Sequence, residues 1–422
     1  MLITKKSKLF WSGAKYSISS TFSSMVSMLV SFTSMHWLGP DILGIWQSLT
    51  IIIAYLPFLQ LGIQSGLNLE LPIELGKGNK VKSDDLVATA KYFAICIAYV
   101  LLIIGICVFI YLLVTDVEDK YLYGFIAVLL ISVITCFRLH FVATYRSAKA
   151  FDKLSNIYLI DSVINLSFLL VIYYYQYYGL IIYYVGKELI ATFLMYLYAP
   201  YRGIKAYFDK AMFYVLLKRG IFMTLFNQIK SAIDSFPKIL LVSIGGVVQV
   251  GLFSPVLAVG TLINMIPSQL AQFLVPQMGY KYGESGKAQD MWIYLKKISL
   301  FMPFIILPFS IIGWLLIPYV VEYFFPKYIE SIVPIRIMLF GFIFSIKLAY
   351  NFLIMIKAYR EVLFLQGVDI VCLLLIPYIC IIYGNYPLTT SLSFGLSIGY
   401  FVSYVVNYWV VKRTVFQTKY NK

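Results

Sequence analysis

The chain has 422 residues, of which 61% are hydrophobic and 13% are charged, about half the charged share of a soluble domain. This composition excludes a soluble globular enzyme, and apolar runs of 18 or more residues recur along the chain, which predicts an all-α polytopic membrane protein. The net charge of +15 does not indicate nucleic-acid binding, because the basic residues lie in small clusters between apolar runs. The five cysteines form no CxxC pair, so we expect no metal site.

The apolar stretches, taken in chain order, predict about 12 transmembrane helices joined by short connections. They cover roughly residues 14–36, 42–66, 87–114, 121–144, 156–176, 179–200, 220–244, 250–275, 293–320, 330–353, 361–383 and 388–411. Of the 34 Lys and Arg residues, 26 lie in the two tails and in the loops that follow even-numbered spans. Two lie in the loops that follow odd-numbered spans, on the opposite side of the membrane. This asymmetry predicts that both termini are cytoplasmic.

The two halves of the chain carry related glycine patterns. The segment LGPDILGIW, which follows the first span, is echoed by GGVVQVGLF after the seventh. Three glycine pairs share one offset of 207 residues: Gly39 with Gly246, Gly44 with Gly251, and Gly76 with Gly283. A parallel repeat of six spans is typical of transporters. We therefore predict two six-helix lobes, residues 1–205 and 206–422, related by pseudo-two-fold symmetry.

The seventh span carries an unusual polar stripe. Lys230, Asp234 and Lys238 stand at i, i+4 and i+8, so they fall within an arc of about 80° on a helix, with Asn227 and Ser231 beside them. The 207-residue offset places them over a row of serines in the first span: Ser20, Ser23, Ser24, Ser27 and Ser31. Such stripes predict a water-filled central cavity with a net-positive site for an anionic group such as pyrophosphate. The alternative is an ion-pair ladder that only holds the helix in register.

Further ionisable residues lie inside the predicted spans. Arg138, in the fourth span, either lines the cavity or extends to the cytoplasmic surface. Asp161 and Asp369 are lone carboxylates that either bind H⁺ or Na⁺ for coupling or accept a local hydrogen bond. Lys187 and Glu188, adjacent in the sixth span, and Glu70 and Glu74, just past the second span, are candidates of second rank. No other cofactor is expected.

The run HWLGPDILGIW, followed by LQLGIQSGLNLELPIELGKGNK, resembles the first two spans of Wzx-type polysaccharide biosynthesis flippases, such as those for O-antigen or capsule repeat units, of the multidrug/oligosaccharidyl-lipid/polysaccharide (MOP) exporter superfamily. The matching positions are His36, Leu38, Gly39, Pro40, Asp41, Gly44, Trp46, Leu61, Gly62, Glu74, Leu75 and Gly76. His36 stands where the family most often has arginine.

The resemblance implies a MATE/MOP-like fold in the bacterial inner membrane and a transporter that is not an enzyme. Its substrate would be an undecaprenyl-pyrophosphate-linked oligosaccharide, moved to the outer face by alternating access between the lobes. Lys230, Asp234, Lys238, Asn227 and Arg138 would meet the anionic headgroup, with His36 at the family's basic position. Its expected partners are membrane lipids and the downstream polymerase machinery.

Two alternatives from other classes stay open at this point. A cation-coupled multidrug exporter of the same superfamily would need a carboxylate site in one lobe, which Asp161 offers. A membrane polysaccharide polymerase would need a large periplasmic loop, whereas the longest predicted non-cytoplasmic loop has about ten residues.

Overall fold

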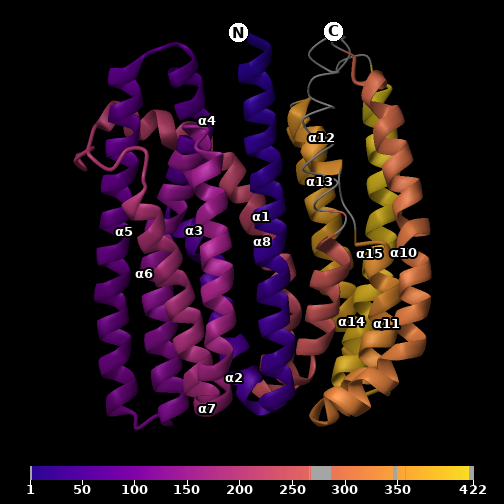
Figure 1. Cartoon of the computed structure of the whole chain (residues 1–422). Coiled ribbons are helices and arrows are strands. Elements are labelled where there is room, and N and C mark those ends of the chain that lie inside the picture. Colours follow the sequence, from indigo (N-terminus) through magenta and orange to yellow (C-terminus); the bar gives the residue numbers. More distant parts are fainter. Residues whose placement is uncertain (1, 266, 268–286, 346–348, 357, 418–422) are drawn as a thin grey trace. The chain divides into compact units, whose positions relative to one another are not determined.

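The computed structural model describes residues 2–265, 267, 287–345, 349–356 and 358–417 (Figure 1). Every long regular element in these ranges is a helix, and eight of the helices described there are long and apolar enough to cross a membrane. This confirms the predicted all-α polytopic architecture. The chain forms two compact units, Met1–Leu38 with Ile45–Ala232 and Gly39–Gly44 with Ile233–Lys422. The lobe boundary at residues 205 and 206 stays a prediction.

The helices up to residue 252 run from α1 to α8. Their bounds are α1 Leu2–Trp37, α2 Pro40–Leu49, the 3-10 helix η1 Thr50–Tyr55, α3 Leu56–Leu59, α4 Ile63–Gly76, α5 Lys80–Val114, α6 Asp119–Ser147, α7 Phe151–Leu197 and α8 Lys210–Leu252. In the first unit α5, α6 and α7 lie side by side (Figure 1), and α1 packs along α7. α1 is not among the eight apolar spans because its serines and threonines lower its hydropathy.

The helices of the second half begin with a short apolar helix, Ser254–Met265. The others are α10 Gln289–Phe324, the 3-10 helix η2 Pro326–Ser331, α11 Ile332–Ile343, α12 Ala349–Met355, α13 Tyr359–Ile370, the π-helix η3 Val371–Leu375, α14 Ile376–Tyr383 and α15 Leu388–Val415. α15 packs against α11 and α14. The predicted span 250–275 lies partly outside the described residues, as does Gly283.

Two of the long helices contain a break in the helical backbone where the sequence predicts a boundary between spans. In α7 the break is at Gln176, with φ 51° and ψ −117°. A Cβ built on Gly179 would lie 2.2 Å from the Val171 carbonyl oxygen, so the two halves of α7 fold back against each other. In α8 the break is at Gly246, with φ 75°. Both breaks match the predicted ends of the fifth and seventh spans.

The predicted span 42–66 is not one helix. It consists of α2, η1, α3 and the start of α4, with Leu61 and Gly62 at positive φ between α3 and α4. The reason lies in the packing of α8 against this segment. A Cβ built on Gly220 would lie 1.9 Å from the Gly62 carbonyl oxygen, and one on Gly66 would lie 2.1 Å from the Leu216 carbonyl oxygen. The two backbones therefore touch, which only glycine allows.

The apolar face of α4 follows from its sequence spacing. Ile63, Leu67 and Leu71 recur every four residues and are fully buried, so they form one stripe along the helix. They pack in one cluster with Leu86 of α5 and Leu216 of α8. This cluster anchors the first part of α8 in the first unit.

The glycine repeat appears in the packing as a reciprocal contact inside the second unit. A Cβ on Gly44 would lie 1.9 Å from the Val247 carbonyl oxygen, and a Cβ on Gly251 would lie 1.6 Å from the Pro40 carbonyl oxygen. Gly44 and Gly251 differ by 207 positions, and so do Pro40 and Val247. The start of α2 and the end of α8 therefore meet through equivalent residues, as pseudo-two-fold symmetry requires.

Candidate functional site

The stripe residues of α8 lie on one continuous helical segment, as predicted, because the non-helical residue within α8 is Gly246. Asn227, Lys230 and Asp234 are exposed, and Lys238 is half-buried. The contact units divide within this stripe, between residues 232 and 233. That these side chains face a common cavity stays a prediction. His36 is exposed in the last turn of α1.

The best-defined polar site in the first unit joins α6 to the second half of α7. The Nε atom of Arg138 lies 2.7 Å from Oε2 of Glu188. The Arg138 side chain is 36% exposed and that of Glu188 is 17% exposed. The sequence named Arg138 as a candidate, but it did not predict this partner.

Lys187, the residue before Glu188, connects α7 to α1. Its Nζ atom donates a hydrogen bond to Ser27 Oγ at 2.9 Å and lies 5.8 Å from the centroid of the Tyr183 ring. Ser27 belongs to the serine row that the sequence predicts for the first span. That row therefore contacts a half-buried cation of its own unit.

Asp161, on the first half of α7, is 4% exposed. Asn165, one turn later, donates a hydrogen bond from Nδ2 to Asp161 Oδ2 at 3.1 Å. Among the described residues, Asp161 Oδ1 and Asn165 Oδ1 have no hydrogen-bond partner. Lys187, Glu188 and Arg138 lie within electrostatic range of the Asp161 carboxylate.

We call Arg138, Asp161, Lys187 and Glu188 the α6–α7 charged cluster. Its two bases and two acids give a formal charge of zero. Ionisable groups at membrane depth are costly and are kept mainly at functional sites. Compensation within the cluster lowers that cost while leaving two cations that an anionic ligand can approach.

The second unit holds a separate buried carboxylate, Asp369 of α13, which is 5% exposed. Tyr350 Oη donates a hydrogen bond to Asp369 Oδ2 at 2.6 Å, and Ser403 of α15 donates one to Oδ1. Asn407, one turn beyond Ser403, is buried, and neither of its side-chain polar atoms has a hydrogen-bond partner among the described residues. This arrangement could accept a small cation or a hydrogen-bond donor.

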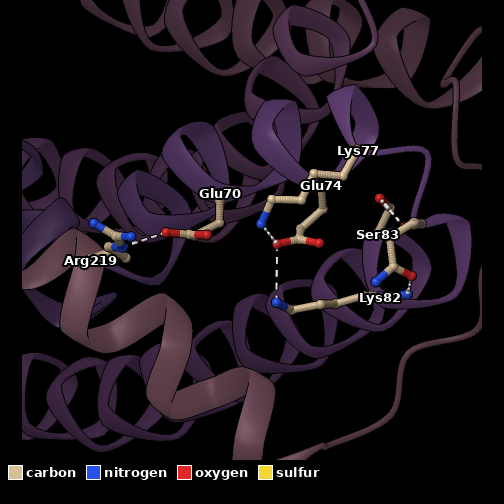
Figure 2. A network of polar contacts seen from close by, with 7 residues as sticks. Glu70, Glu74, Lys77, Lys82, Ser83 and Arg219 are labelled. Atoms are coloured by element: carbon tan, nitrogen blue, oxygen red, sulfur yellow. Dashed lines mark hydrogen bonds and ion pairs between the residues drawn. The ribbon is translucent and has the colours of Figure 1, made fainter.

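An ionic network with two buried carboxylates surrounds the end of α4 (Figure 2). Arg219 Nε lies 2.5 Å from Glu70 Oε1, which links α8 to α4. Glu74 Oε1 accepts hydrogen bonds from Lys77 Nζ and Lys82 Nζ, both at 3.0 Å. These bonds lower the pKa of Glu74 below its ordinary value. Figure 2 shows both carboxylates pointing from α4 toward their basic partners.

Sequence reasoning ranked Lys187, Glu188, Glu70 and Glu74 second and missed their partners. The sequence does mark these four residues as unusual, because each is a charged residue within or next to an apolar run. The partners lie far apart in the chain, as with Glu70 and Arg219, so no local pattern could pair them. In the part of the chain that the structure describes, no cluster of three His, Cys, Asp or Glu residues could hold a metal ion.

A sequence profile described as polysaccharide biosynthesis protein matches residues 37–334. No curated protein matches the chain by sequence. The fold is shared with solved transporters. An inward-facing multidrug resistance MATE family transporter of the MOP superfamily aligns with a TM-score of 0.70 at 14% identity, over 93% of this chain and 94% of the other.

Two further solved structures align over similar lengths. A MOP superfamily transporter from Pyrococcus furiosus aligns with a TM-score of 0.66 at 16% identity, over 97% of this chain and 96% of the other. That transporter is described as having a binding pocket of reverse polarity that suggests a different function. A variant of the Vibrio cholerae MATE transporter VcmN aligns with a TM-score of 0.64 at 12% identity, over 98% of this chain and 100% of the other. These likenesses show that the fold is that of MATE transporters in the MOP superfamily.

Proposed function

Because this chain belongs to the polysaccharide biosynthesis protein family, we propose that it is a flippase for lipid-linked oligosaccharides. It carries undecaprenyl-pyrophosphate-linked repeat units from the cytoplasmic to the outer face of the bacterial inner membrane by alternating access. Both termini are cytoplasmic in this proposal, and the chain moves its substrate without catalysing a reaction. Its partners are the lipid-linked oligosaccharide, the surrounding lipids and the polymerase machinery that consumes the product.

The α6–α7 charged cluster is the observation that carries this proposal. An apolar helical unit that only had to span the membrane would gain stability from apolar residues in place of Arg138 and Lys187. The two cations instead offer charge-assisted hydrogen bonds to phosphate oxygens. In this proposal Lys230 and Lys238 of α8 are further cations for the headgroup, with Asn227 and Asp234 as polar neighbours. His36 stands at the family's basic position at the end of α1.

Ion coupling belongs to the same proposal. Asp161 and Asp369 are the residues suited to bind H⁺ or Na⁺, since both carboxylates are buried. Asp161 Oδ1 and Asn165 Oδ1 are two acceptors on neighbouring turns without donors among the described residues, which favours Asp161 as the cation site.

A cation-coupled multidrug exporter is the second candidate function. The fold supports it, because the solved structures that align include multidrug resistance transporters. Buried Asp161 would then bind the coupling ion or a cationic drug. The family match to polysaccharide biosynthesis proteins favours the flippase.

The first experiment deletes the gene and locates lipid-linked oligosaccharides on each membrane face. A flippase predicts that undecaprenyl-linked glycan accumulates on the cytoplasmic face and that surface polysaccharide is lost. Repeat units that reach the outer face but stay unpolymerised would indicate a polymerase. Unchanged glycan with increased sensitivity to cationic drugs would indicate the exporter, and Asp161→Asn would then be tested first.

The α8 stripe gives a prediction at residue level. Lys230→Ala and Lys238→Ala should each reduce surface polysaccharide about tenfold at an unchanged protein level, because each removes a cation that meets the anionic headgroup. Lys218→Ala is the control, since Lys218 is an exposed lysine of α8 outside the stripe. Normal polysaccharide in the Lys230→Ala/Lys238→Ala double variant would remove the stripe from the transport mechanism.

A further inference from the structure

Arg138 is only partly engaged by its partner. Its Nε atom lies 2.7 Å from Glu188 Oε2, so this ion pair uses one of the three guanidinium nitrogens. A guanidinium presents five N–H donors in a planar fork that matches two oxygens of a carboxylate or phosphate. With 36% of the side chain exposed, this fork can receive a second anion.

Glu188 gives Arg138 the chemical group that a phosphate would give it, namely an anionic oxygen acceptor. The contact joins two different helices, α6 and α7, so it does not serve to hold one helix in register. An uncompensated charge at this depth would cost several kcal/mol. A transporter that releases its anionic substrate must therefore supply a replacement counter-ion for Arg138.

We propose that Glu188 is the resident counter-ion of Arg138 in the empty protein and that a phosphate oxygen of the lipid headgroup replaces it during transport. This inference rests on the proposed flippase function. When Glu188 is displaced, Lys187, the preceding residue of α7, supplies the positive charge beside it. Glu188 is thus a positioning residue that weakens substrate binding and makes release possible.

The proposal predicts opposite effects of the two partners on binding. Removing the Glu188 charge removes the competitor for Arg138, so Glu188→Gln should bind the headgroup more tightly yet release it more slowly. Removing the Arg138 charge should weaken binding. A merely structural ion pair predicts instead that both variants lose stability together, with no gain in affinity.

The test uses the full-length protein in lipid nanodiscs and measures equilibrium binding of undecaprenyl pyrophosphate, alongside surface polysaccharide in cells. Relative to wild type, Glu188→Gln should lower Kd about tenfold and reduce surface polysaccharide, and Arg138→Gln should raise Kd about tenfold. Glu188→Asp, which keeps the carboxylate, should restore export in part. Glu118→Gln is the matched control, because Glu118 is an exposed acid 3.5 Å from Lys120 and should leave both measurements unchanged.

Three outcomes overturn the proposal in different ways. If wild type binds undecaprenyl pyrophosphate but the Kd of Glu188→Gln is unchanged or higher, the proposed role of Glu188 is refuted and the flippase function is not. If wild type shows no saturable binding of undecaprenyl pyrophosphate, both the role of Glu188 and the flippase function are refuted. If Glu188→Gln fails to fold, the Arg138→Gln/Glu188→Gln variant decides, because recovery of wild-type export in this double variant would show that the pair is structural.

Discussion

Gly220→Ala tests the contact between α4 and α8 that holds the start of α8 in the first unit. The added Cβ would lie 1.9 Å from the Gly62 carbonyl oxygen and 2.5 Å from the Gly66 nitrogen. Favourable carbon contacts need about 3.5 Å, so the helices must separate by about 1.5 Å. Gly62 cannot move freely to relieve the clash, because its φ of +81° sets the turn into α4.

The expected cost follows from two opposing effects. Overpacking of a close contact costs about 1 to 3 kcal/mol. Alanine in a helix recovers about 1 kcal/mol relative to glycine. The separation would also stretch the Ser65–Thr224 hydrogen bond, which is 2.9 Å long, so the net loss should be about 1 to 2 kcal/mol. For a unit of this size the apparent Tm should fall by about 2 to 8 °C.

The assay is thermal unfolding of the purified protein in detergent, read by the amount that stays monodisperse after heating. Gly367→Ala is the control, since Gly367 lies within α13 and a Cβ there would meet no atom within 4 Å. That variant should keep or raise the Tm. Equal Tm values for the two variants would show that α4 and α8 do not pack backbone to backbone in the folded protein.

Two further predictions concern the ionic network and the glycine repeat. Lys77 and Lys82 lower the pKa of Glu74, so their stabilising effect is complete at neutral pH and is lost as the pH falls below about 4.5 toward the folded-state pKa. The apparent Tm of wild type should therefore drop more between pH 7 and pH 4 than the apparent Tm of Glu74→Gln. Parallel curves of Tm against pH for the two proteins would contradict the pairing. Gly44→Ala and Gly251→Ala should each lower the Tm by a similar amount, because the two added Cβ atoms would lie 1.9 and 1.6 Å from equivalent carbonyl oxygens. A lower Tm in one variant alone would argue against a reciprocal contact.

The helices and their membrane class were predictable from the sequence, because the lipid solvent leaves few solutions for an apolar chain. Runs of 18 or more apolar residues must hydrogen-bond their own backbone, so they become helices wherever they occur. The breaks at Gln176 and Gly246 fall where short polar or glycine-rich segments interrupt these runs. The glycine offset of 207 residues agrees with the reciprocal contacts of Gly44 with Val247 and of Gly251 with Pro40, since a repeat carries its contacts with it.

The pairing of charges was decided by tertiary structure alone. Arg138 and Asp161 could be named as candidates because any ionisable residue in an apolar span is unusual. Their surroundings could not be named, because Glu188 reaches Arg138 only after the two halves of α7 fold back and pack beside α6. The break at Leu61 and Gly62 was also hidden, since it follows from the close approach of α8 at Gly220, about 160 residues later in the chain. Composition and periodicity are local and set the helices, whereas ion pairs and close backbone contacts depend on which helices become neighbours.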